Sequence, residues 1–510
     1  MPVELSLEAT RARFLQAQTR RQPWESLWRD CYAYALPQRG AGFGGEFAPG
    51  RTGTERLFDG TALDAVDQLA ASLLAELTPP FSQWFDLVPG SALDPLERGP
   101  FAELLEDTGR IVQGHLERSN FAVEMHQAFL DLVTVGNATL LLEEAPTGTM
   151  SALRFTAIPL AEMFFECGAD HRIEGHFRRT RLGRSALQAR YPFCELPQAG
   201  GVRDGAEPMH EVVEAIIPER VGFAYRAFLE DGSSSPVPLA EGLFESSPFI
   251  SFRWLKAAAE VYGRSPVMSA LPDIKTVNKV VELVLKNASI SVTGIWQADD
   301  DGVLNPATIK LVPGSIIPKA VGSSGLTPLQ APGRFDVSTL MLDELRARIR
   351  RTLLADRLGP ASGPRMTATE ILERSQETAR LLSATYGRLQ AELLTPLLAR
   401  TVQILKRRGE IPDLPVDGRT VQIAFRSPLA RSQAQRDVQN TLLWLETAGK
   451  LGAEAMQAVD VPATTQWLGH TLGVPSRLIR DSKLPSALVD QLELLDQAAD
   501  EVLEESLDER

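Results

Sequence analysis

The sequence predicts an α+β protein that is mainly helical, and three observations support this prediction. Apolar residues recur at helical spacing through the first 135 residues. Short runs with a period of two, separated by turn residues, follow from about 138 to 255. The remainder is helical again, apart from a small β-like insertion between two helices and one strand near residue 420. Separate helical and mainly antiparallel β segments are typical of the α+β class.

Four helices are expected in the first part of the chain. The run "WESLWRDCYAYAL" places its tryptophans, Leu27 and Cys31 on one apolar face, and Pro37 ends that helix. A second helix follows with Thr61 as its N-cap and stops at a pair of prolines. Two more amphipathic segments lie near 98–119 and 122–135.

The β region contains six runs that we expect to be strands. They are "ATLLLEE", "ALRFTAIP", "RIEGHFRRTR", "VVEAIIP", "FAYRAFLEDG" and "PFISFRW". The run "RSALQARYP" interrupts them with helical spacing. Together these runs predict a mainly antiparallel sheet.

The middle of the chain carries two basic helices. The first is expected to open at Pro272, and its Lys275, Lys279, Glu282 and Lys286 share one face. The second spans 336–357, with Arg346, Arg350 and Arg357 on a common face. Two interpretations of these faces stay open: solvated charge paired with acids of a neighbouring element, or contact with phosphates or a neighbouring subunit.

The chain between the two basic helices is β-like, and the chain after them breaks at "GPASGPRM". A long helical pattern then runs from about Thr369 to Arg408, with a kink expected at Pro396. The run "RTVQIAF" is a last expected strand, and 428–510 is helical with an acidic end.

Composition excludes several classes of protein. The 510 residues carry a net charge of −14, which argues against a tight nonspecific clamp on nucleic acid but not against a protein that loosely surrounds DNA. No apolar run reaches the roughly 18 residues of a membrane span, so no membrane partner is expected. The three cysteines lie far apart and imply no disulfide framework.

A match to G-x-G-x-x-G occurs at Gly40, Gly42 and Gly45. A dinucleotide loop needs a strand before it and a helix opening at its third glycine. Here a helix precedes the match, and Pro49 and further glycines follow it. We therefore interpret the stretch as a turn-rich connector and expect no nucleotide cofactor.

Other motifs give no catalytic, cofactor or metal site. No P-loop, H-E-x-x-H or C-x-x-C motif occurs. The run from Asp299 to Asp301 resembles only the beginning of a calcium loop and is better explained as a solvated hairpin turn. One cluster of potential metal ligands is better explained as a surface strand: Cys167, His171, Glu174 and His176.

The order of elements resembles the portal, or head-to-tail connector, proteins of tailed bacteriophages, in particular those of short-tailed phages. Three runs carry the resemblance: "RLFDGTALDAVDQLAASLLAELTPPFSQWFDL", "YGRSPVMSALPDIKTVNKVVE", and "RMTATEILERSQE" followed by "LQAELLTPLLARTVQIL". The resemblance extends from about residue 10 to 430.

This resemblance implies a portal fold assembled as a ring, usually of twelve subunits, at one vertex of the capsid. The implied parts are a wing (1–262 with the long helix and return strand, 367–427), a stem (263–291 and 336–357), a clip (292–335), a tunnel loop (358–366) and a crown (428–510).

The implied function is a conduit for double-stranded DNA during packaging and ejection, with no enzymatic activity. Implied partners are the terminase large subunit, then a tail adaptor, together with the major capsid and scaffolding proteins. The protein would lie in the virion, and in the host cytoplasm during assembly. Alternatives are a helical tail adaptor or scaffold protein, or an enzyme, either a nuclease or a nucleotide-dependent enzyme.

The expected functional residues fall into three groups. The candidates for the DNA channel are Arg346, Arg350, Arg357, Arg365, Lys275, Lys279 and Lys286. The tunnel loop contains Gly359, Pro360, Ala361, Ser362, Gly363 and Pro364. The clip candidates that would face the terminase or adaptor are Trp296, Asp299, Asp300 and Asp301.

Overall fold

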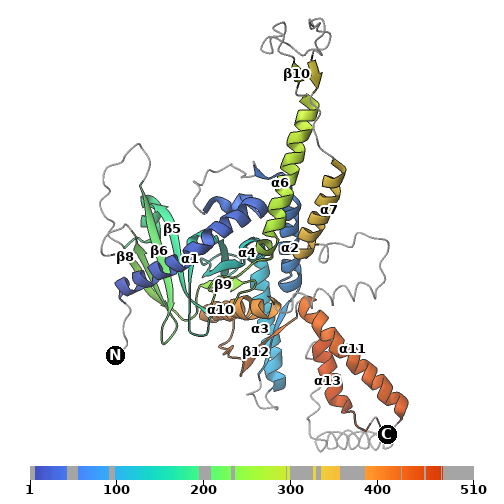
Figure 1. The fold of residues 1–510 in the computed structure, drawn as a ribbon. Coiled ribbons are helices and arrows are strands. Elements are labelled where there is room, and N and C mark those ends of the chain that lie inside the picture. The colour runs from blue at the N-terminus through green and yellow to red at the C-terminus, as the bar shows by residue number, and fades with distance from the viewer. Residues whose placement is uncertain are drawn as a thin grey trace, which may run out of the picture.

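The computed structural model has an α+β body from which a pair of helices projects (Figure 1). A short strand pair lies at the tip of the projection, and a helical hairpin extends from the opposite end of the body. The structure describes residues 6–42, 56–90, 98–193, 208–230, 236–293, 296–298, 326–328, 335–355, 385–426, 428–452, 455, 457–472 and 474.

The N-terminal helices confirm the predicted pattern. They are α1 (Leu7–Ala35), α2 (Thr61–Leu77), α3 (Arg98–Arg118) and α4 (Phe121–Val135), and a short 3-10 helix, η1 (Pro37–Gly42), follows α1. The prediction that Thr61 is the N-cap of α2 is wrong, because Thr61 is already helical. The carboxylate of Asp59 accepts a hydrogen bond from the Thr61 N–H (3.0 Å) and supplies the acceptor that an N-cap would provide.

Two antiparallel sheets form the β part of the body. The smaller has the order β3-β2-β9, from β2 (Asn137–Glu144), β3 (Leu153–Ile158) and β9 (Phe249–Arg253). The larger runs β4-β5-β6-β7-β8, from β4 (Met163–Cys167), β5 (Ile173–Gly183), β6 (Met209–Pro218), β7 (Phe223–Leu229) and β8 (Val237–Phe244). Helix α5 (Arg184–Arg190) packs beside the larger sheet, as the run "RSALQARYP" predicted.

Three strands of the body were not predicted. Strand β1 (Phe85–Pro89) pairs with β12 (Val421–Phe425), and only β12 was expected. Strands β4 and β8 were also missed. The run of β1 ends in a proline, which is unfavourable in a strand. The first three residues of β4 are all buried, so its run does not alternate. Strand β8 is an edge strand with an exposed middle, so its alternation is weak.

The projection consists of α6 (Pro266–Thr293) and α7 (Phe335–Thr352), with β10 (Trp296–Ala298) pairing with β11 (Leu326–Pro328) at its tip. Helix α6 does not open at Pro272, which lies inside it. A proline in a helix loses one backbone hydrogen bond. Here the preceding turns are retained because Val267, Ala270 and Leu271 are buried in the main core.

The long helical pattern is described from residue 385. The segment is helical to Leu389, passes through a π-turn, η4 (Gln390–Leu394), and continues as α10 (Thr395–Arg407). The α-helical pattern is therefore interrupted by a π-turn that ends two residues before Pro396, whereas the kink at Pro396 stays a prediction. Helices α11 (Pro428–Leu451) and α13 (Val461–Leu472) form the hairpin beyond β12. Among the described helices, none has the length and apolarity that a membrane crossing requires.

One main core joins the helices, the small sheet and the root of the projection. Trp28 of α1 packs edge-on against Tyr262, which precedes α6, with ring centroids 4.9 Å apart. The same core includes Phe129 of α4 and Phe252 of β9. The base of the projection is thus part of the body, while its outer half extends beyond it (Figure 1).

Candidate functional site

The candidate functional site is the projecting pair α6–α7. One face of α7 is buried in the main core through Leu342, Leu345 and Ile349, and Leu353, just after the helix ends, is buried there too. On α6 the residues buried in that core lie in its first half: Val267, Ala270, Leu271, Ile274 and Val277. These buried apolar faces hold the two helices against the body and against each other where they leave it.

The base of the helix pair is hydrogen-bonded to the connector before α2 through Asn278 of α6. The side-chain oxygen of Asn278 accepts hydrogen bonds from the N–H groups of Phe58 (2.6 Å) and Asp59 (3.2 Å). Its side-chain nitrogen donates to the carbonyl of Arg56 (2.9 Å). Sequence reasoning missed Asn278, although an asparagine among valines inside a helix is a signal, because a buried amide needs partners.

Arg346 of α7 also binds the connector before α2. Its guanidinium donates to the carboxylate of Asp59 at 2.9 and 2.7 Å. Burial by itself would raise the pKa of Asp59, but hydrogen bonds from Thr61 and Arg346 outweigh it and hold this pKa below its usual value. This arginine, expected to face the channel, thus also holds α7 against the body.

The basic face of α6 is paired with acids of the same subunit. Lys275 forms an ion pair with Asp30 of α1 (2.6 Å). Lys279 (3.0 Å) and Lys286 (2.6 Å) both contact Glu282, and hydrogen bonds from these lysines lower its pKa. Pairing with an acid of a neighbouring element, one of the two interpretations left open by the sequence, therefore applies to Lys275. Lys279 and Lys286 instead pair with an acid of their own helix, and Glu282 with its two lysines keeps one net positive charge.

The remaining basic candidates differ in what the structure describes. Arg350 is exposed near the end of α7, and no described residue forms an ion pair with it. Arg357 and Arg365 lie outside the described residues, as does the predicted tunnel loop from Gly359 to Pro364.

The outer half of the projection exposes large apolar side chains. On α6, Leu283 is 53% exposed and Leu285 is 52% exposed. On α7, Leu340 is 75% exposed and Met341 is 48% exposed. Leu283 and Leu285 are two residues apart, which places them about 200° apart around the helix. Helix α6 thus presents leucines on opposite flanks, and α7 alone cannot cover both.

The tip of the projection contains one clip candidate within the described residues. Trp296 begins β10 and pairs in register with Pro328 of β11. The acidic run from Asp299 to Asp301 lies outside the described residues.

The residues considered as metal ligands do not converge. No group of three or more potential ligands lies together in the part of the chain that the structure describes. The expectation of a surface strand is wrong for His176, which is buried in β5 between Phe165 and Phe249. His171 lies before β5 in a turn with a positive φ of 62°.

The described part of the glycine match lacks the strand that precedes a dinucleotide loop. Helix α1 precedes it, and Pro37–Gly42 is a 3-10 helix. Arg39 of this segment binds Asp131 of α4 at 3.0 Å. Gly45 lies outside the described residues. The described part of this stretch is thus a connector that an ion pair holds against α4.

These features define an α+β protein with a projecting helix pair whose apolar flanks extend beyond its own core. The family model described as "Bacteriophage head to tail connecting protein" matches residues 7–479. The chain therefore belongs to this family of head-to-tail connecting proteins.

Several relatives match over most of the chain. The "Probable portal protein" of Bordetella phage BPP-1 is 25% identical over 92% of this chain and 88% of its own length. The portal protein of Escherichia phage T7 is 22% identical over 78% of this chain and 74% of its own length. A solved structure, the neck of a native gene transfer agent particle computed with C12 symmetry, is 12% identical with a TM-score of 0.38, covering 83% of this chain and 92% of that chain.

Proposed function

We propose that this protein is a phage portal subunit: it forms a dodecameric ring at one capsid vertex, through which double-stranded DNA enters and later leaves the head. Membership of the head-to-tail connecting family across residues 7–479 supports the proposal. So do relatives that are named portal proteins and match 78% or more of the chain.

The observation that carries the ring is the pair of exposed leucines on opposite flanks of α6. A subunit in a ring has one neighbour on each side, and each contact joins two different surfaces. Leu283 and Leu285 lie about 200° apart, so one can meet each neighbour. Large exposed apolar surfaces on a folded protein mark contact sites, and Leu340 and Met341 of α7 extend this one.

The parts of the ring follow from the same proposal. Residues 263–291 and 336–357 form the stem, and 292–335 form the clip on which the terminase large subunit docks before the tail adaptor replaces it. The wing comprises 1–262 and 367–427 and faces the major capsid and scaffolding proteins. The tunnel loop spans 358–366 and the crown 428–510.

In this proposal the channel binds the DNA phosphates only weakly. Lysines and arginines that neutralise phosphates release counterions and make binding tight and strongly salt-dependent. In this chain four of the seven channel candidates already contact acids of their own subunit: Lys275, Lys279, Lys286 and Arg346. Arg350, exposed on α7, is the described candidate most available to phosphates, and cyclic symmetry would repeat it as a basic ring.

The ring is tested by electron microscopy of the purified protein together with sedimentation. The wild-type chain should give annular particles with a central hole. Replacing both leucines (Leu283→Glu, Leu285→Glu) should leave a folded subunit that does not close into rings. The matched control is Val123→Glu, which changes an apolar residue of the body that is 65% exposed, and it should still form rings. Rings of the double variant as stable as those of the wild type would refute the proposed stem contact.

A further inference from the structure

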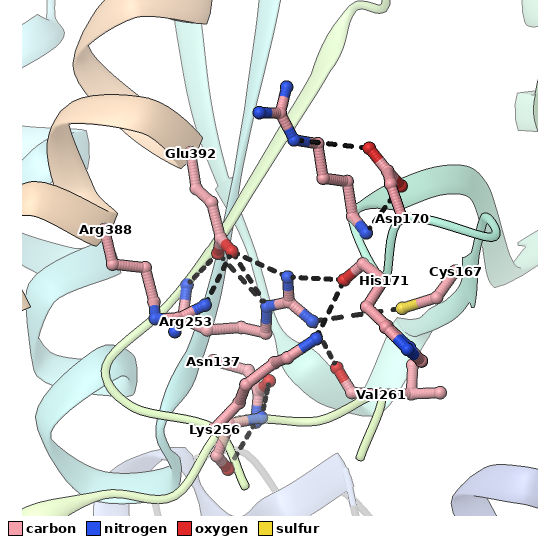
Figure 2. Close-up of polar contacts among 11 residues, drawn as sticks. Asn137, Cys167, Asp170, His171, Arg253, Lys256, Val261, Arg388 and Glu392 are labelled. Atoms are coloured by element: carbon pink, nitrogen blue, oxygen red, sulfur yellow. Dashed lines mark hydrogen bonds and ion pairs between the residues drawn. The ribbon is translucent and has the colours of Figure 1, made fainter. Parts of the chain in front are cut away.

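A buried arginine joins the root of α6 to the π-turn in the long helix (Figure 2). Arg253 is the last residue of β9 and is 1% exposed. Its guanidinium donates to the Glu392 carboxylate from Nη2 (2.6 Å) and from Nε (3.1 and 3.2 Å). The backbone N–H of Arg253 donates to the same carboxylate at 3.0 Å. Glu392 lies in the middle of the π-turn, so this turn is held directly against the free edge of β9.

The same guanidinium also holds the chain that leads into α6. Arg253 Nη1 donates to the carbonyl of Val261 at 3.0 Å, and Nη2 donates to the carbonyl of His171 at 3.3 Å. Lys256, in the link between β9 and α6, donates to that carbonyl too, at 3.0 Å. One side chain therefore fixes β9, the turn before β5, the link 254–265 and the π-turn.

The chain is packed against the body on both sides of the π-turn. Before the turn, Tyr386 and Leu389 are buried in the main core. Helix α10 after the turn is fixed to the body, since Leu397, Leu398 and Leu405 are buried and Arg400 donates to the carbonyls of Leu142 (2.9 Å) and Ser246 (2.6 Å). A π-turn contains one residue more than the α-helical turn it replaces. Losing that residue would rotate the preceding helix by about 100° and move it by about 1.5 Å relative to α10.

We propose that the Arg253–Glu392 pair couples the π-turn to the link 254–265, which positions α6. In this proposal the π-turn gains or loses one residue, which changes the helical register of the chain before α10. Arg253 transmits that change to the link, and we call the pair the coupling joint. Glu392 belongs to the adjustable turn, and Arg253 belongs to the sheet edge from which the link departs. The joint is a property of the subunit fold, so this proposal can be tested independently of whether the subunits assemble into a ring.

The test is hydrogen exchange of the full-length protein measured by mass spectrometry. Glu392→Gln keeps the shape of the side chain and removes its charge. It should raise exchange both in 386–394 and in the link 255–264 by roughly 10- to 100-fold, since hydrogen bonds to charged groups are among the stronger ones. Exchange in 398–405 should not change. The control is Glu260→Gln, which removes a surface ion pair with Arg264 (2.5 Å) inside the same link, and it should leave the π-turn unaffected.

A second comparison covers the possibility that Glu392→Gln unfolds the protein. The double variant Arg253→Met with Glu392→Leu replaces the pair by apolar side chains, a change that buried ion pairs often tolerate. Deleting Ala391 removes the extra residue of the π-turn. The deletion should change exchange in the link when Arg253 and Glu392 are present, and should not do so in the double variant. Equal changes in both backgrounds, or a response to Glu392→Gln on only one side of the joint, would overturn the proposal.

Discussion

The most quantitative prediction concerns His176, a buried histidine whose two ring nitrogens have no hydrogen-bond partner among the described residues. Its ring lies 6.1 Å from that of Phe165 and 6.0 Å from that of Phe249, measured between centroids. Burial lowers the pKa of His176 to about 3. In the unfolded chain a histidine has a pKa of about 6.5. Between these values the unfolded state binds a proton and the folded state does not.

The contribution of this residue to stability is therefore complete above pH 6.5 or so, and it is lost as the pH falls toward 3. Each pH unit in this window lowers the free energy of unfolding by about 1.4 kcal/mol, which amounts to about 2.7 kcal/mol at pH 4.5. His176→Phe removes the titrating group and keeps an aromatic ring between Phe165 and Phe249. From pH 7 to 4.5 we expect the variant to lose about 2–3 kcal/mol less stability than the wild type, whatever its constant packing cost.

The assay is urea-induced unfolding at pH 7 and pH 4.5, followed by circular dichroism. The matched control is His126→Gln, because the His126 side chain is 28% exposed and lies 3.9 Å from Asp67 at the surface of α4. This control should retain the acid sensitivity of the wild type. If His176→Phe loses as much stability on acidification as the wild type, the buried histidine is not the cause and the reasoning fails.

Three further predictions concern the root, the backbone and the tunnel. Asn278→Ala leaves three backbone groups of the α2 connector without their partner, so thermal denaturation should show a loss of about 1–3 kcal/mol; an unchanged melting temperature would contradict this role of Asn278. Gly136→Ala should destabilise the fold far more than Gly148→Ala: both have positive φ (74° and 93°), but only at Gly136 would a Cβ meet backbone atoms, 2.7 Å away. Replacing Gly359 and Gly363 by alanine should impair DNA packaging in an in vitro assay more than ring assembly; loss of assembly with normal packaging would count against the proposed tunnel loop.

Local sequence patterns predicted most elements of the fold. Helical spacing located α2, α3, α4 and α7 to within a few residues, because one face of each is buried in the same core. The six expected strands are present, since alternation records which face of a sheet is buried. The prediction failed for α6, where a proline suggested a helix start, and for β1, which gains its strand structure by pairing with β12 more than 300 residues away. The run of β12 was recognised as a strand, but its partner was not, because a pairing between residues so far apart in the chain leaves no local signal.

Sequence by itself thus determined the class of the fold, the family resemblance and the basic character of the two projecting helices. Only the tertiary structure decided what those basic residues contact: Lys275 meets Asp30 of α1, and Arg346 meets Asp59 before α2. It also decided that His176 is buried and that Arg253 meets Glu392, 139 residues later in the chain. The physical reason is that helical and strand periods follow from neighbouring residues, whereas ion pairs and burial depend on how distant elements pack, which no local pattern encodes.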